Sequence, residues 1–266
     1  MTEPDTNADD GWTLRAWGQD FHAAACTLTR LPLPAPAADV ALLPRVRRAY
    51  PMVGAFVGLA AGGVFFAAHD VGLPLAVNAV LAVAALILVG GHMDDRGSRA
   101  AAPLMVATML KISSLYVLGN AATPGGGPHM VVLALVAAGA LSHAAALLLE
   151  PDAQQSEDDD DDDDRGSNVV IMPPDGTQIT EAEMDEGNGR ELGAPATAII
   201  FALVVTAAAL GLIAGVVAAA GATAGAWLAP RILAREIDAQ TLPMPLALQQ
   251  SAEVWALMAL AVLLSV

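Results

Sequence analysis

The sequence predicts an all-α fold: a polytopic helical membrane protein with about seven transmembrane helices. Hydrophobic residues make up 55% of the 266 positions and the mean hydropathy is +0.54, values too apolar for an ordinary soluble domain. Several uncharged runs approach or exceed the roughly 20 residues that a bilayer core requires. Ala and Gly are frequent inside these runs, and small residues allow membrane helices to approach one another closely.

The N-terminal segment, residues 1–49, precedes the first span and is expected to be cytoplasmic. Residues 12–30 predict an amphipathic helix lying on the membrane, with a solvent-exposed tail helix as the alternative. The apolar side of this helix would carry four large residues: Trp12, Trp17, Phe21 and Leu28. Three prolines in residues 31–36 cannot continue a helix, so that stretch is expected to be an extended linker.

Residues 50–149 are expected to form a first transmembrane bundle of about four spans. The expected spans cover about residues 50–68, 73–91, 103–120 and 129–149. Short turns separate them, marked by Gly and Pro residues. Basic residues flank the first two spans on one side, which the positive-inside rule assigns to the cytoplasm; they are Arg45, Arg47, Arg48, Arg96 and Arg99.

An acidic insertion, residues 150–191, follows the fourth span. Its sixteen acidic residues and two arginines account for nearly all of the formal net charge of −16. Seven consecutive aspartates repel one another and cannot build a core, so a disordered cytoplasmic loop is expected, with a divalent-cation sponge as the alternative. A chain of this charge does not favour nucleic acid as a partner.

Residues 192–266 are expected to form a second transmembrane part of about three spans. Residues 192–230 are free of charge for 39 positions, enough for two short crossings with a turn near residues 211–221. The last span covers about residues 246–266. The expected location is therefore the plasma membrane of a prokaryote, with several crossings of the lipid bilayer, and a homo-oligomer remains open.

His92, Asp94 and Asp95 follow the second span directly, where water and ions reach the membrane face. Carboxylates bind Mg²⁺ through one or two side chains and commonly share the ion with substrate phosphates. The pattern therefore indicates phosphoryl or pyrophosphate chemistry, in which a metal neutralises charge on the leaving group. A solvated loop that merely ends the helix is the alternative interpretation.

Polar residues inside two later spans are the second set of candidates. Lys111 lies in the middle of the third span, where a charge is costly and usually faces a cavity or a partner. It is interpreted as a phosphate contact, as an interhelical partner of a residue such as Glu253, or as a long side chain that snorkels to the membrane surface. Gln249, Gln250 and Glu253 lie near one face of the last helix and would either line a polar pocket or bond neighbouring helices. His143, in the fourth span, is interpreted as a packed polar residue.

Several blocks of the chain resemble cobalamin synthase, the membrane adenosylcobinamide-GDP ribazoletransferase family. They occur in the family's order: residues 27–34 (TLTRLPLP), 50–54 (YPMVG) with Gly58, 90–94 (GGHMD), 110–115 (LKISSL), 239–241 (AQT) and 249–254 (QQSAEV). The chain departs from the family after Asp94, where further aspartates of the family motif have no counterpart unless Asp95 replaces one of them. It also has Leu141-Ser142-His143 where the family has Leu-Ser-Arg.

The resemblance implies an enzyme that uses Mg²⁺ to join adenosylcobinamide-GDP to α-ribazole or its 5′-phosphate, with release of GMP. In that case Asp94 would bind the ion, Asp95 would assist, and His92 would orient a carboxylate or phosphate. Lys111, Gln249, Gln250 and Glu253 would contact substrate. Two alternatives stay open: a corrinoid-binding or assembly protein on the same scaffold with impaired catalysis, and a small-solute transporter.

Overall fold

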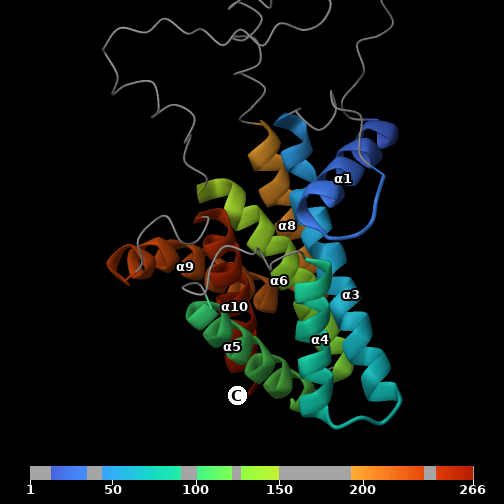
Figure 1. Cartoon of the computed structure of the whole chain (residues 1–266), viewed down its shortest axis with the longest axis vertical. Helices are drawn as coiled ribbons and strands as arrows, with labels where there is room; N and C mark the ends of the chain where they lie inside the picture. Colours follow the sequence, from blue (N-terminus) through green and yellow to red (C-terminus); the bar gives the residue numbers. More distant parts are fainter. Residues whose placement is uncertain are drawn as a thin grey trace, which may run out of the picture.

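The computed structural model describes residues 13–34, 44–90, 101–121, 127–149, 193–236 and 244–265. Every regular element within these ranges is a helix (Figure 1). In chain order the elements are α1 (Leu14–Leu28), η1 (Pro44–Ala49), α3 (Tyr50–Asp70), α4 (Leu75–Val89), α5 (Ala101–Asn120), α6 (Pro128–Leu149), α8 (Gly193–Leu210), α9 (Leu212–Glu236) and α10 (Met244–Ser265).

The predicted polytopic helical fold is confirmed. Four helical stretches are long and apolar enough to cross a membrane: Val46–Asp70, Pro128–Leu147, Leu212–Ala229 and Ala247–Ser265. Three shorter apolar helices accompany them: Leu75–Val89, Leu104–Asn120 and Pro195–Leu210. These seven stretches correspond to the seven expected spans, while the number of actual crossings stays a prediction. The acidic insertion, residues 150–191, lies outside the described residues.

Glycine and proline set the helix ends, as the sequence indicated. Gly72, Gly127 and Gly211 have φ values of 85°, 89° and 80°, in the left-handed region that residues with a Cβ rarely adopt. They follow α3, precede α6 and separate α8 from α9, respectively. Pro51 lies in the first turn of α3, where its missing N–H costs no intrahelical bond. The expected turn between the fifth and sixth spans therefore occurs at Gly211.

Helix α6 lies at the centre of the bundle and contacts α3, α8, α9, α10 and α5. Its closest neighbour is α3, whose Gly54, Gly58 and Gly62 recur every four residues and share one face. A Cβ on Gly54 would collide with the carbonyl oxygen of Gly139, and one on Gly58 with that of Leu135. The two backbones are therefore in direct contact, as small residues at membrane helix interfaces permit.

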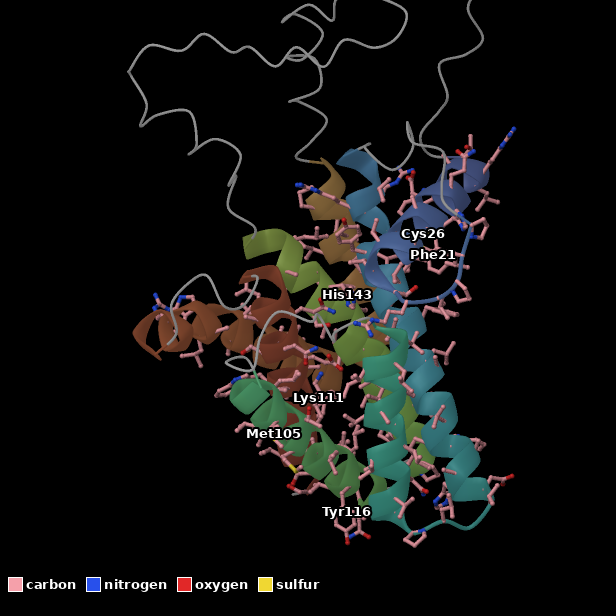
Figure 2. The ribbon with its side chains drawn as sticks, viewed as in Figure 1. Phe21, Cys26, Met105, Lys111, Tyr116 and His143 are labelled. Carbon is pink, nitrogen blue, oxygen red and sulfur yellow. The ribbon has the colours of Figure 1, made fainter. Side chains whose placement is uncertain are left out.

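Helix α5 lies on the outside of the bundle, against α10 and α4 (Figure 1). Its outer side is exposed at Met105 and Tyr116, whereas Lys111 is 95% buried and faces inward (Figure 2). Exposed apolar side chains of this kind suit contact with lipid. The buried lysine shows that polar interactions contribute to holding the inner side of α5 against the bundle.

Helix α1 packs on the bundle. Thr13 caps it by accepting a hydrogen bond from the Ala16 N–H at 3.2 Å, and Asp20 is completely buried. A carboxylate oxygen of Asp20 lies 2.7 Å from an Arg48 guanidinium nitrogen of η1. The exposed-tail alternative is therefore wrong, because a buried ion pair fixes the helix. Trp17, Phe21 and Leu28 of the expected apolar side are partly buried, and Trp12 lies outside the described residues.

Candidate functional site

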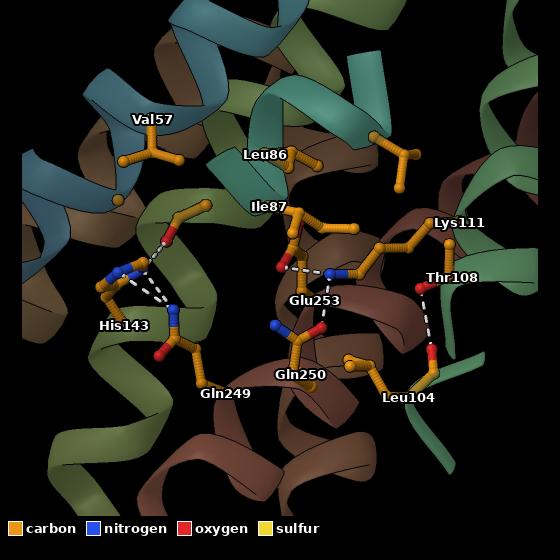
Figure 3. A pocket seen from close by; sticks show the side chains of 13 residues that line it. Val57, Leu86, Ile87, Leu104, Thr108, Lys111, His143, Gln249, Gln250 and Glu253 are labelled. Atoms are coloured by element: carbon orange, nitrogen blue, oxygen red, sulfur yellow. Dashed lines mark hydrogen bonds and ion pairs between the residues drawn. The ribbon is translucent and has the colours of Figure 1, made fainter. Parts of the chain in front are cut away.

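A polar cluster joins α5 to α10 inside the apolar bundle (Figure 3). The Lys111 ammonium donates to Glu253 Oε2 at 2.8 Å and to Gln250 Oε1 at 2.7 Å. The side chains of Lys111 and Glu253 are each 6% exposed. Because a lone buried charge is expensive, the lysine and the glutamate require each other in this position. The interhelical pairing considered for Lys111 is thus observed.

A second polar contact joins α10 to α6. His143 Nδ1 lies 2.9 Å from the Gly139 carbonyl oxygen, which accepts hydrogen bonds and cannot donate them, so Nδ1 carries the proton. His143 Nε2 then accepts from the Gln249 amide nitrogen at 3.1 Å. This pattern describes a neutral imidazole. The adjacent residues Gln249 and Gln250 therefore bind different neighbours, one on α6 and the other on α5.

These two contacts border one small cavity. Its volume, taken as the space open to the centre of a water molecule, is about 20 Å³. A single water molecule needs about 10–15 Å³ on this measure. One wall is apolar and comes mainly from α3 and α4, while the polar wall comes from α5, α6 and α10 (Figure 3). The lining residues are Gly54, Val57, Val83, Leu86, Ile87, Leu104, Thr108, Lys111, Gly139, His143, Gln249, Gln250 and Glu253.

The cavity lies beside the end of α4. Leu86 and Ile87, which line the cavity, belong to the last turn of this helix. The Arg30 N–H donates to the Val89 carbonyl oxygen at 3.1 Å, so the extended segment after α1 also contacts this end. The extended segment after α1 and the end of α4, which are far apart in sequence, therefore meet beside the cavity.

The predicted site residues fall into two groups. Lys111, Gln249, Gln250 and Glu253 all line the same cavity, which confirms that they are neighbours but leaves their contact with substrate a prediction. His92, Asp94 and Asp95 lie outside the described residues. Within the part of the chain that the structure describes, no group of three or more His, Cys, Asp or Glu side chains could hold a metal ion.

Two residues of this cavity, His143 and Gly54, are not predicted as site residues by the sequence. His143 is buried and hydrogen-bonded, as expected for a packed polar residue, and it also lines the cavity. Gly54 provides the space for it, since a Cβ there would collide with His143 Nδ1. The sequence does contain a sign of this arrangement, because Gly139 and His143 are four residues apart and therefore share one face of α6. In the structure that face lies against the glycine row of α3.

Comparison with known protein families finds that residues 20–95 match a family described as cobalamin-5-phosphate synthase. Over these residues the chain is similar to that family. The matched stretch runs from Asp20 of α1 through α3 and α4 to Asp95. It therefore includes the apolar wall of the cavity and the His92–Asp95 motif, and the resemblance seen in the sequence is confirmed there.

Two curated relatives carry the name adenosylcobinamide-GDP ribazoletransferase. The protein of Azorhizobium caulinodans is 39% identical over 82 residues, which cover 29% of this chain and 31% of the relative. The protein of Brucella anthropi is 43% identical over 72 residues, covering 26% and 28%. The similarity thus spans less than a third of each relative. No solved structure matches the chain.

Proposed function

We propose that this protein is a membrane transferase of cobalamin biosynthesis. It joins adenosylcobinamide-GDP to α-ribazole or α-ribazole 5′-phosphate and releases GMP. In this reaction a ribazole hydroxyl attacks the phosphorus next to the corrinoid, and the bond from that phosphorus to the GMP oxygen breaks. The family match and the names of the two relatives support this reaction and favour neither an assembly protein nor a transporter.

One observation carries the proposal: three of the sequence blocks that resemble the family meet in space. Gly54 of α3, Lys111 of α5 and the Gln249–Glu253 stretch of α10 all line one cavity. Ile87 of α4 lines it too and precedes His92 by five residues. Blocks scattered over two hundred residues thus belong to one region.

Within this region we assign roles by chemistry. Asp94 and Asp95 would hold Mg²⁺, because adjacent carboxylates are the ligands this ion takes, and the ion would neutralise charge on the pyrophosphate when bound. His92 would orient a phosphate or one of these carboxylates. Lys111, Gln249, Gln250 and Glu253 would contact substrate at the cavity. The Arg-flanked ends of α3 and α4 would face the cytoplasm, as the positive-inside rule predicts.

The test uses the purified full chain in liposomes with adenosylcobinamide-GDP, α-ribazole 5′-phosphate and Mg²⁺, with GMP and corrinoid product followed by chromatography. We expect product that requires Mg²⁺ and that falls by about 100-fold or more in Asp94→Asn, because a metal ion contributes several kcal/mol to charge stabilisation and each 1.4 kcal/mol is tenfold.

Asp70→Asn is the matched control, since Asp70 is exposed at the opposite end of α3 from Gly54. Its activity should equal that of the native chain. Folded native protein that binds corrinoid but forms no GMP would instead support the impaired-scaffold alternative. Corrinoid uptake into sealed vesicles without any product would support transport.

A further inference from the structure

Among the described residues that line the cavity between α5, α6 and α10, Lys111 and Glu253 carry opposite charges. Lys111 Nζ and Glu253 Oε2 are 2.8 Å apart and both side chains are buried. His143, the other titratable residue among these described lining residues, has the hydrogen-bond pattern of a neutral imidazole. An anion that entered would meet the glutamate as well as the lysine. The electrostatics therefore favour an uncharged occupant over a phosphate.

Hydrogen-bonding capacity remains in the polar wall despite this neutrality. Lys111 has three N–H donors, and described residues accept from two of them. The amide nitrogen of Gln250 is turned toward the space between Glu253 and the His143–Gln249 contact (Figure 3), and no described residue accepts from it. Val57, Leu86 and Ile87 face these donors from the apolar wall. The cavity thus suits a small polar group carried on an apolar body.

Size supports the same conclusion. The cavity has room for about one water molecule, roughly 20 Å³. After small side-chain movements it would admit a hydroxyl or the end of a carboxamide. A phosphate group brings several oxygens and at least one negative charge, and it would have to separate Lys111 from Glu253. Separating a buried ion pair leaves an uncompensated charge in the apolar interior, which is strongly unfavourable.

We propose that this cavity is a subsite for an uncharged hydrogen-bonding group of the substrate, namely one carboxamide arm of the corrinoid, and that the phosphates bind outside it. This inference rests on the proposed function for the identity of the substrate. Lys111 and Gln250 donate to the carboxamide oxygen, and Glu253 positions Lys111 while cancelling its charge. The ion pair therefore makes a strong donor available without attracting anions into the bundle.

The experiment measures two equilibrium affinities of the full chain in detergent. Cobinamide carries the corrin carboxamides without a phosphate, and GMP carries a phosphate without a corrin. The test variant is the double substitution Lys111→Met/Glu253→Met, which removes both charges and retains side-chain volume. The control is Ser113→Met, which places the same side chain on the exposed side of α5.

We expect the double variant to lose cobinamide affinity by at least about tenfold, because hydrogen bonds to a charged donor are lost. Its GMP affinity should change less than twofold, and the control should keep both affinities. A fall in GMP affinity with unchanged cobinamide binding would overturn the proposal, since it would make Lys111 a phosphate ligand. Unchanged affinity for both probes in a folded double variant would overturn it as well.

Gln250→Met gives a second, independent measurement, because it leaves the ion pair intact and removes the amide. It should also weaken cobinamide more than GMP, and an equal effect on both would contradict the subsite. Failure of the proposed function would look different: the native chain would bind cobinamide through these residues and form no GMP from adenosylcobinamide-GDP. Product formation with all variants binding cobinamide normally would overturn the subsite alone.

Discussion

Two helix interfaces of this molecule are built on opposite principles. Where α3 meets α6, glycines have no side chain to separate the helices, so the two backbones are in contact, as at Gly54 and Gly139. Where α5 meets α10, long polar side chains cross the gap, and Lys111 bonds Glu253 and Gln250. The cavity lies between these two interfaces. Close packing without polar groups fixes the position of one wall, and the polar groups are available for chemistry on the other.

The difference predicts how each interface fails. A glycine interface is sensitive to added volume and indifferent to charge. A polar interface is sensitive to the loss of one partner, because the other is then left charged in an apolar interior, and it is far less sensitive to the loss of both. Three substitutions, ordered by expected effect, test these expectations.

The largest effect is expected for Lys111→Met alone. Removing the ammonium breaks the buried Lys111–Glu253 ion pair, and breaking such a pair costs about 3–5 kcal/mol. The combined substitution Lys111→Met/Glu253→Met should cost much less than the single one, since two apolar side chains replace two charges. Unfolding by denaturant in detergent measures both. Equal destabilisation by the single and double variants would contradict this expectation, because it would show that a buried Glu253 without Lys111 costs no more than a methionine in its place.

A smaller effect is expected for Gly54→Ala. The added Cβ would collide with the Gly139 carbonyl oxygen and with His143 Nδ1, and overpacking of this kind costs about 1–3 kcal/mol. Because His143 lines the cavity, cobinamide affinity should fall as well. Gly63→Ala, on the same helix with no atom within 4 Å of its Cβ, is the matched control and should be neutral or slightly stabilising. Equal effects of the two substitutions would contradict the close α3–α6 contact.

The fold was largely predictable because its determinants are local. Uncharged runs of sufficient length specify the helices, and Gly72, Gly127 and Gly211 mark their boundaries through backbone conformations that other residues avoid. Boundaries moved by a few residues: α3 continues to Asp70, two positions beyond its expected end. The packing of α1 was not predictable, since Asp20 and Arg48 are 28 residues apart and nothing in either position indicates its partner.

The site was predictable in composition but not in arrangement. Lys111 and Glu253 stood out because charges are rare in apolar spans, and their pairing was one of three interpretations. The sequence could not show that Gln249 and Gln250 bind different helices, because this depends on where α6 and α5 lie around α10. His143 was undervalued for the same reason: its importance comes from the neighbouring glycines of α3, which only the folded chain brings together.

The smallest predicted effect concerns the interface of α9 with α10, which combines both principles. Gly225 lets α9 approach α10, since a Cβ there would lie 2.7 Å from the Ser251 carbonyl oxygen. The Ser251 hydroxyl also donates to the Gly225 carbonyl oxygen at 2.8 Å. Interhelical hydrogen bonds in membranes contribute about 0.6 kcal/mol on average. Ser251→Ala should therefore destabilise by about that amount, and Ser113→Ala, at an exposed position, by less.

The comparison becomes sharper if Ser251→Ala is combined with Gly225→Ala. When glycine contact dominates this interface, Gly225→Ala alone should destabilise by about 1–3 kcal/mol through overpacking, and the serine substitution should add little, because the helices have already separated. When the hydrogen bond dominates, Ser251→Ala should cost more than Gly225→Ala. Unfolding measurements on the two single variants and the double variant distinguish these cases. If Gly225→Ala has the larger effect, the α9–α10 interface depends on backbone contact, as the α3–α6 interface does.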